Sequence, residues 1–469
     1  MTLHVLLTDF FIWLLVVGLF GYGRSVYRNP LALENWRLVF QSKIAIVSSL
    51  VLALALSIAL LDSIHFKLDA QRQSAYGSPI VSLLDVVVGP LAYERETSYS
   101  APLAIHALNR SAVETKLGTV RDYERLQFGG AHLSNPLEQG LDVLLLTYEG
   151  ALLGILFWAT LLLLIWLIVQ AQNDQKSNVG GLSLFDFCNR SVLLSTTIWT
   201  VLCLAILCGV VARLAEHYHV LGTDKVGVDV LYSSLKSLRT AMLIGLLTTL
   251  LTLPLGVAMG LAAGYFQGWV DDVIQYIYTT LNSIPSVLLI AATVLMLQVA
   301  LEANPELFAS SLEKADLRLF FLCAILGLTS WTGLARLIRG EVLKMRELEY
   351  VLAARASGVG HFSILSNHLL PNLMHLVLIA MVMDFSGLVL AEAVLSYVGV
   401  GVDPSTFSFG TMINAARLEL SREPVVWWSL TAAFVFMLLL VLSANLFADA
   451  VRDAFDPRAR QLKQTLVRV

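Results

Sequence analysis

The sequence predicts an all-α integral membrane protein. Hydrophobic residues make up 57% of its 469 residues and charged residues 14%, and the mean hydropathy is +0.74. Soluble domains carry about 25% charged residues, so this composition indicates a membrane protein. A helix that crosses a bilayer needs about 20 predominantly apolar residues, and nine stretches meet this need. They cover residues 4–21, 43–61, 144–170, 191–212, 240–264, 271–299, 319–338, 373–398 and 426–448.

The spans and the basic connections predict how the chain crosses the membrane. The first span starts close to Met1 without a basic segment or a clear cleavage site, so we expect a retained signal anchor. Lysine and arginine gather in the connection after that span, in residues 339–372 and in the C-terminal tail. Because short cytoplasmic connections are rich in these residues, the three segments are predicted to lie in the cytoplasm, with the N-terminus outside.

Residues 62–142 then lie outside the membrane, between the second and third spans. The stretch Val81–Tyr93 is too short to cross a bilayer and predicts a strand or an interfacial helix. Turn signals predict a folded insert, and they lie at Gly77-Ser78-Pro79, Gly129-Gly130 and Asn135-Pro136.

The hydrophilic segment 341–371 separates the seventh span from the eighth. Apolar residues recur at helical spacing over its first half, and charged residues take the other side. Gly358 predicts the end of this helix, because glycine readily adopts the left-handed conformation of a C-terminal cap. A second short helix is predicted over 361–370, and Pro371 suits the first turn of the next span.

Two functions fit this helix–turn–helix segment. The short side chains of Ala353 and Ala354 let the backbone approach a partner closely, which favours a surface gripped by another protein. An amphipathic helix that only lies on the lipid headgroups has the same spacing. The spacing alone leaves both functions open.

Two acidic residues, Asp384 and Glu392, lie inside the eighth span, where a charge costs about 3 kcal/mol. They are eight residues apart and share roughly one face of a helix. We predict that they face a cavity or pair with another helix, and a protonated structural acid is the alternative. Pro285 predicts a kink in the middle of the 271–299 span.

The sequence contains no motif for catalysis, nucleotide binding or metal binding. No lysine follows a glycine, so the phosphate loop G-x4-G-K-[ST] is absent. The four cysteines are not spaced to bind zinc, so we expect them to serve as small apolar side chains. They are Cys188, Cys203, Cys208 and Cys323. We therefore expect a protein that is not an enzyme and needs no cofactor. The net charge of −4 gives no indication of nucleic-acid binding.

The segment Glu349–Asn372 also carries a longer pattern. It reads EYVLAARASGVGHFSILSNHLLPN, and five of its residues are in register with E-A-A-x3-G-x9-I-x-L-P: Ala353, Ala354, Gly358, Leu370 and Pro371. The segment resembles the cytoplasmic EAA loop of permease subunits in binding-protein-dependent ABC importers, which has this pattern. Leu352 stands where the family has glutamate, and His368 stands where it has isoleucine. Glu349, one turn earlier, is placed to substitute for the missing acid.

Four further stretches resemble the dipeptide and oligopeptide class of these permeases, in the same order. They are HVLGTDKVGVDVL from His219, LGVAMGLAAGYFQGWVDD from Leu255, AEAVLSYVGVGVDPSTFSFGTM from Ala391 and DAVRDAFDPR from Asp449. The resemblance covers about 185–460 and implies a six-helix type I permease core. Three extra transmembrane helices then lie in 1–61 and 143–180, with the external insert at 62–142 and a cytoplasmic tail at 461–469.

The resemblance also implies partners in the bacterial inner membrane. A second, homologous permease subunit would complete the substrate path, and two cytoplasmic ATPase subunits would each receive one coupling loop, residues 341–371. An external binding protein would deliver peptides or related small solutes. The residues implied in coupling to the ATPase are Glu349, Ala353, Ala354, Gly358 and Pro371.

Other functions remain open from the residues alone. A secondary transporter or a channel that works without partners uses broken helices and acidic residues within its spans, and this sequence offers both. A membrane-anchored assembly or sensor protein, with the insert as its working part, is a further alternative.

Overall fold

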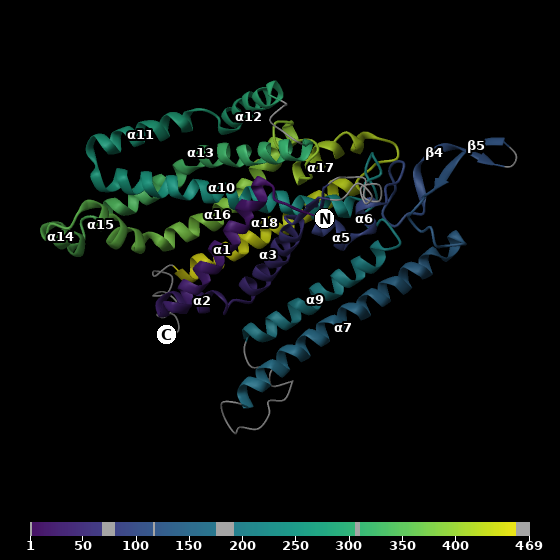
Figure 1. Ribbon diagram of the computed structural model, residues 1–469, viewed down its shortest axis with the longest axis horizontal. Helices are drawn as coiled ribbons and strands as arrows, with labels where there is room; N and C mark the ends of the chain where they lie inside the picture. The colour runs from purple at the N-terminus through teal and green to yellow at the C-terminus, as the bar shows by residue number, and fades with distance from the viewer. Residues whose placement is uncertain (1, 68–79, 116–117, 175–191, 305–309, 456–469) are drawn as a thin grey trace, which may run out of the picture. The chain divides into compact units, whose positions relative to one another are not determined.

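A computed structural model describes residues 2–67, 80–115, 118–174, 192–304 and 310–455 (Figure 1). Among these residues, nine helices are long and apolar enough to cross a membrane, which confirms the predicted helical membrane protein. The chain forms two compact units. The first contains Met1–His4, Phe40–Leu238 and Ala415–Ser443, and the second contains Val5–Val39, Arg239–Asn414 and Ala444–Val469. Cys188, the loop residues 175–190 and the predicted tail 461–469 lie outside the described residues.

The first unit contains the described part of the insert and the helices around it. Its helices are α3 (Lys43–Asp62), α5 (Leu83–Val88), α6 (Pro90–Tyr93), α7 (Gln139–Asp174) and α9 (Val192–Ala215), with the starts of α10 (Val230–Phe266) and α18 (Trp428–Phe455). Two antiparallel sheets join β1 (Thr2–His4), β2 (His65–Lys67) and β3 (Ile80–Ser82), and β4 (His106–Thr115) with β5 (Gly118–Arg125). The all-α prediction did not include these sheets. Val81–Tyr93 contains both predicted alternatives, the end of a strand and two short helices.

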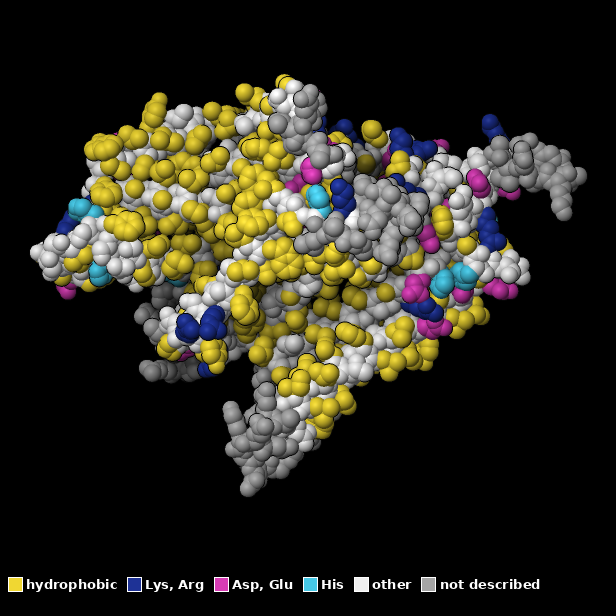
Figure 2. Space-filling view, in the orientation of Figure 1, with side chains coloured by type: hydrophobic (Ala, Val, Ile, Leu, Met, Phe, Trp, Pro, Cys, Tyr) yellow, Lys and Arg dark blue, Asp and Glu magenta, His cyan; other side chains and the backbone are white. Residues whose placement is uncertain are grey.

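Glycines bring α7 and α9 together side by side (Figure 1). A Cβ atom on Gly154 would lie 2.4 Å from the carbonyl oxygen of Ala205, and one on Gly209 would lie 2.4 Å from that of Gly150. The two backbones approach this closely because no side chains intervene, as is typical of membrane helices. Hydrophobic side chains cover much of the visible surface of α7 (Figure 2), which suits contact with lipid.

The second unit contains most of the remaining helices. They are α1 (Leu7–Arg28), α2 (Pro30–Val39), α11 (Gly268–Ser283), α12 (Ser286–Ala303), α13 (Ser311–Met345), α14 (Glu349–Ala356), α15 (His361–Ile364), α16 (Leu370–Val398) and α17 (Phe409–Ala416), with the later parts of α10 and α18. The predicted span 271–299 is interrupted between α11 and α12, which confirms the break expected at Pro285. A π-helical turn, Leu365–Leu369, joins α15 to α16.

Small residues also pack α10 against α13 within the second unit. A Cβ atom on Gly260 would lie 2.7 Å from the carbonyl oxygen of Ala335, and one on Gly264 would lie 2.7 Å from Cβ of Val342. Gly256 meets Leu334 in the same way, at 2.8 Å. The glycine row of α10 therefore serves packing inside this chain.

A buried ion cluster ties α10 to the insert within the first unit. Nζ of Lys236 lies 3.0 Å from Oδ1 of Asp62 and 2.9 Å from Oδ1 of Asp85. The hydroxyl of Tyr232 donates to Asp85 at 2.9 Å. Asp85 and Ser82 also form a reciprocal capping box at the start of α5. The cluster thus joins α3, α5 and α10 through groups that are almost fully buried.

Replacing Lys236 by methionine is expected to destabilise the protein by about 3 kcal/mol, because it leaves two buried carboxylates without their cation. The shift in the midpoint of unfolding by a denaturing detergent measures this change. Lys225→Met is the matched control, since Lys225 is exposed and its loss should change stability by less than about 0.5 kcal/mol. Equal midpoints for the two variants would contradict the assigned role of the cluster.

Candidate functional site

We call α14, α15 and the turn between them the elbow, residues Glu349–Ile364. It lies beyond the ends of α13 and α16 (Figure 1). Gly358 takes a left-handed φ of +75° directly after Ser357, the C-cap residue of α14. The helix end is closed by backbone N–H groups of Ser357, Gly358 and Val359, which donate to carbonyl groups of Ala353, Arg355 and Ala354. This arrangement confirms the predicted helix end at Gly358.

Residues of α10 and α13 hold the elbow in place. Val351 and Ile364 are buried in an apolar cluster with residues of α10, α13 and α16. The hydroxyl of Tyr265 lies 2.8 Å from Nδ1 of His361. The guanidinium of Arg346 donates to the carbonyl oxygen of Tyr265 at 3.1 Å. Each buried apolar side chain contributes about 1.5–3 kcal/mol, so the elbow is fixed to the ends of these helices.

Tyr265, Arg346 and His361 are therefore central to the elbow. The sequence analysis placed Arg346 and His361 in the segment 341–371 without a role in holding it, and it did not connect Tyr265 with that segment. Their sequence signal is weak, because Tyr265 is about 80 residues from Arg346, a separation that only the tertiary fold closes. Tyr265 is also among the largest fully buried side chains of the described chain. It packs against Arg355 as well, whose guanidinium carbon lies 5.5 Å from the centre of the ring.

One face of α14 stays exposed. Glu349, Leu352, Ala353 and Ala356 recur at helical spacing and are all exposed. Leu352 is 44% exposed, and Phe362 of α15 is 83% exposed. Exposed apolar side chains with charged neighbours commonly mark a surface that contacts another molecule. The elbow thus combines a fixed inner side with an open outer side.

The structure spreads the predicted coupling residues over several environments. Glu349 and Ala353 lie on the exposed face of α14, whereas Ala354 packs partly against the apolar cluster. Gly358 is exposed in the turn of the elbow, and Pro371 is exposed in the first turn of α16. Their role in coupling stays a prediction.

The two acidic residues of α16 have different surroundings. Glu392 is 1% exposed, and the hydroxyl of Ser396 donates to its carboxylate at 2.6 Å. The same hydroxyl oxygen accepts the backbone N–H of Val402 at 3.2 Å. These contacts favour the structural alternative for Glu392. Asp384 is only half-buried, and a cavity-facing role for it stays a prediction.

The segment that follows α9, residues 217–229, is clasped by the insert within the first unit. The backbone N–H groups of Glu96, Leu103 and Gly130 donate to the carbonyl groups of Gly227, His219 and His217, at 3.0, 2.9 and 2.8 Å. The hydroxyl of Thr223 accepts the backbone N–H of Ser100 at 2.7 Å. The insert and this segment are therefore joined through their backbones.

His219 lies at the centre of this junction, between two carboxylates. Its Nδ1 is 2.8 Å from Asp229 and its Nε2 is 3.5 Å from Glu96. Burial alone would lower the pKa of His219, but the two carboxylates outweigh burial and raise it to about 9. Burial alone would raise the pKa of Glu96, but His219 and three backbone N–H groups, of Gln127, Phe128 and Gly129, lower it to about 2.

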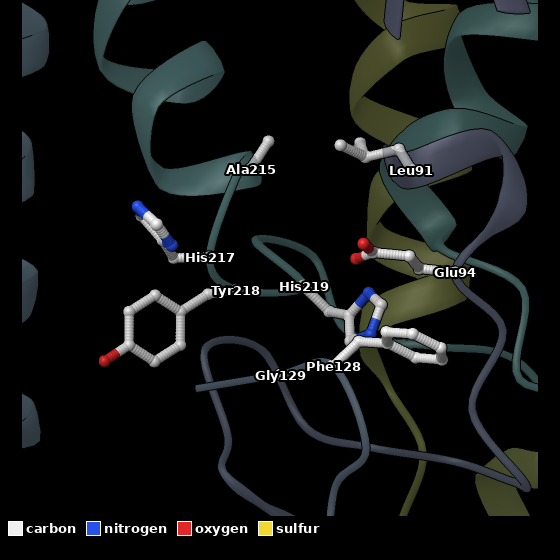
Figure 3. A pocket seen from close by; sticks show the side chains of 8 residues that line it. All are labelled: Leu91, Glu94, Phe128, Gly129, Ala215, His217, Tyr218 and His219. Carbon is white, nitrogen blue, oxygen red and sulfur yellow. The ribbon is translucent and has the colours of Figure 1, made fainter. Parts of the chain in front are cut away.

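A small pocket adjoins this junction (Figure 3). Leu91 and Glu94 face Ala215 across it, while the ring of Tyr218 points away. Its volume of about 10 Å³ holds roughly one water molecule and is too small for a substrate. Although several histidines and carboxylates gather nearby, no three His, Cys, Asp or Glu of the described chain are placed to hold a metal ion. The junction is thus a structural centre.

Comparison with known proteins identifies the family. Residues 256–461 match the family described as "Binding-protein-dependent transport system inner membrane component". The oligopeptide transport system permease protein OppC of Mycobacterium tuberculosis is 31% identical over 246 residues, which cover 52% of this chain and 78% of that protein. The chain belongs to this permease family. It is therefore the inner-membrane permease of an ABC importer and crosses the membrane several times.

Two other relatives of this permease carry related names. The dipeptide transport system permease protein DppC of Lactococcus lactis is 32% identical over 243 residues, covering 52% of this chain and 65% of that protein. The peptidoglycan transport system permease protein YejE of Agrobacterium fabrum is 36% identical over 240 residues, covering 51% and 57%. The residues before 256 lie outside the family match.

The junction around His219 predicts a defined pH dependence. Its folded pKa of about 9 exceeds the ordinary value of 6.5, so its stabilisation is complete below pH 6.5 and is lost as the pH rises through 9. Glu96 has a folded pKa of about 2 against an ordinary 4.5, so its contribution is complete above pH 4.5 and is lost as the pH falls through 2.

Hydrogen exchange of residues 217–229, corrected for the intrinsic effect of pH, is therefore expected to show the strongest protection between pH 4.5 and 6.5. In the His219→Gln variant, protection should no longer change between pH 6.5 and 9. Unmodified protein whose protection stays constant up to pH 9 would show that the histidine is not held in its charged form.

Proposed function

We propose that this permease imports peptides or related small solutes, with ATP hydrolysed by partner subunits as the source of energy. The relatives named above are permeases of oligopeptide, dipeptide and peptidoglycan transport systems, which supports a peptide-like substrate. The observation that carries the proposal is the elbow, because it presents an exposed face on a segment anchored to α10, α13 and α16. Such a segment transmits a movement of a bound partner protein to α10, α13 and α16.

The mechanism follows from that anchoring. A cytoplasmic ATPase subunit contacts the exposed face of α14. A second ATPase subunit contacts the corresponding elbow of the second permease. Closure of the two ATPase subunits on ATP moves both elbows, and the helices behind them switch the substrate path from one side of the membrane to the other. An external binding protein supplies the substrate.

The domain organisation belongs to the same proposal. Residues 185–460 form the permease core and 341–371 the coupling loop. The segments 1–61 and 143–180 supply three additional membrane helices, and 62–142 lies on the external side. The binding protein then meets the external connections of the core together with the insert, since the insert clasps residues 217–229.

Leu352 occupies the place of the family glutamate, and its surroundings suggest how the missing acid is replaced. Glu349 lies one turn earlier on the same exposed face of α14. Its carboxylate is therefore available to a basic group of the ATPase close to where the family glutamate would be. The apolar Leu352 adds contact area beside it.

The variant Ala353→Asp is expected to assemble normally but to lose substrate-stimulated ATP hydrolysis by about tenfold, because a charge is placed at the centre of the contact. The purified complex in lipid vesicles provides the measurement. Asn367→Asp is the matched control, since Asn367 is exposed next to the elbow and off the face of α14. Full stimulation in the Ala353→Asp complex would reject the elbow as the ATPase contact.

A second pair of variants tests the replacement of the acid. Glu349→Ala should reduce stimulated ATP hydrolysis about fivefold, because a charge pair with the ATPase is lost. Adding Leu352→Glu to that variant should restore most of the activity. Glu302→Ala is the control, because Glu302 is exposed on α12 and lies outside the elbow and the coupling loop. If the double variant is no better than Glu349→Ala alone, the two positions are not equivalent.

A further inference from the structure

A polar cavity lies between α11 and α13 in the second unit. Its volume is about 450 Å³, and it is lined by Tyr278, Thr279, Asn282, Ser283 and Arg336. The hydroxyl of Thr332 donates to Oδ1 of Asn282 at 3.1 Å, which turns the amide N–H groups of Asn282 toward other acceptors. No carboxylate is among the residues that line the cavity. It is therefore rich in hydrogen-bond donors and carries a single charge.

That charge is the guanidinium of Arg336, which is exposed on α13. It lies over the ring of Tyr278, 5.4 Å from its centre. Within the described parts of the chain, no hydrogen bond or ion pair of Arg336 is present. Arg339, one turn later, is different, because its Nε and Nη2 each donate to Asp271 at 2.6 Å. An arginine in a membrane helix without an acidic partner normally faces an aqueous path or a ligand.

The polar side chains of the cavity gather at the end of α11. Thr279, Asn282 and Ser283 lie in its last turns and end at the break before Pro285, and α12 after the break is long and apolar enough to cross a membrane. Trp269 and Tyr276, earlier on α11, are 76% and 73% exposed, and Tyr276 shares the helix face of Thr279 and Ser283. The amide and hydroxyl groups at the end of this helix suit water or a polar ligand better than lipid. Interrupted helices line the substrate sites of many transporters.

We propose that this cavity is a substrate subsite that accepts a carboxylate, the C-terminal carboxylate of the transported peptide. The inference rests on the proposed function. Arg336 presents a planar set of N–H donors that matches a carboxylate, and the amide of Asn282 adds another donor. The apolar part of the peptide then lies along the path beyond the break. Two other sources offer the same anionic chemistry, a lipid phosphate and an acidic side chain of the second permease.

Transport of two probe peptides separates these sources. The assembled complex in vesicles is given trialanine or trialanine with an amidated C-terminus. In the Arg336→Gln complex, uptake of trialanine should fall about tenfold more than uptake of the amide, because only trialanine offers the carboxylate. Uptake of trialanine by the Arg336→Lys complex should lie between that of the unmodified complex and that of the Arg336→Gln complex, since lysine keeps the charge and loses the paired geometry.

An equal loss for both peptides would overturn the proposal, because Arg336 would then bind a lipid or the partner permease, or only support the fold. Unmodified complex that transports neither peptide would reject the peptide importer itself together with the subsite. Transport of both by unmodified complex with unequal losses in Arg336→Gln is the supporting result.

Chemical labelling tests the charge of the cavity without transport. Ser283→Cys is placed in a complex whose native cysteines in this chain are replaced by serine, and anionic and cationic thiol reagents are compared. The ratio of the anionic to the cationic labelling rate should be about tenfold higher in this complex than in the same complex with Arg336→Gln added. Leu288→Cys, on the apolar surface of α12 and 64% exposed, is the control and should react with neither. No reaction at position 283, or a charge preference that Arg336→Gln leaves unchanged, would overturn the inference.

Discussion

The pairing of charged groups within and beside the membrane helices is the constraint on which the rest of the structure depends. In the second unit, Arg239 donates to Asp9 at 2.7 Å, and the backbone N–H of Thr8 donates to Asp316 at 3.1 Å. These contacts attach α1, far before the family match, to α10 and to α13, and α13 lies within the match. Removing one partner of such a buried pair costs several kcal/mol, so α1 is an integral part of the permease.

The packing of the elbow suits its proposed role in coupling to an ATPase. A surface that receives force must be attached to the helices that move, and here the attachment is an apolar cluster shared by α10, α13, α14 and α16. The glycines of α10 let its backbone lie directly against α13, so little compressible side-chain volume separates the two helices. A displacement of α14 is therefore passed to both helices behind it.

Sequence predicted those features that depend on composition and local geometry. The nine spans follow from apolar length, the turn at Gly358 from the freedom of glycine at positive φ, and the break near Pro285 from the missing backbone donor of proline. Contacts between residues far apart in the sequence could not be predicted from it. Nothing in the sequence indicates that Glu392 is fully buried while Asp384 stays half-buried, or that Arg339 pairs with Asp271 whereas Arg336 has no acidic partner among the described residues. Apart from β3, which overlaps the strand offered as one alternative for Val81–Tyr93, the strands of the insert were missed because each is short or carries little apolar alternation.

The junction around His219 extends the same reasoning to the insert. Gly222 and Gly227 both take a φ of +73°, and a Cβ atom there would lie 2.5 Å from the carbonyl oxygen of Ser100 and 1.8 Å from that of Glu96. Glycine is thus required twice over, for its backbone conformation and for the close approach of the insert. Because Asp229 also accepts the backbone N–H of Leu231 at 2.7 Å at the start of α10, the histidine that it pairs with is tied to a membrane helix. The insert, the histidine and the first turn of α10 therefore form one connected structure.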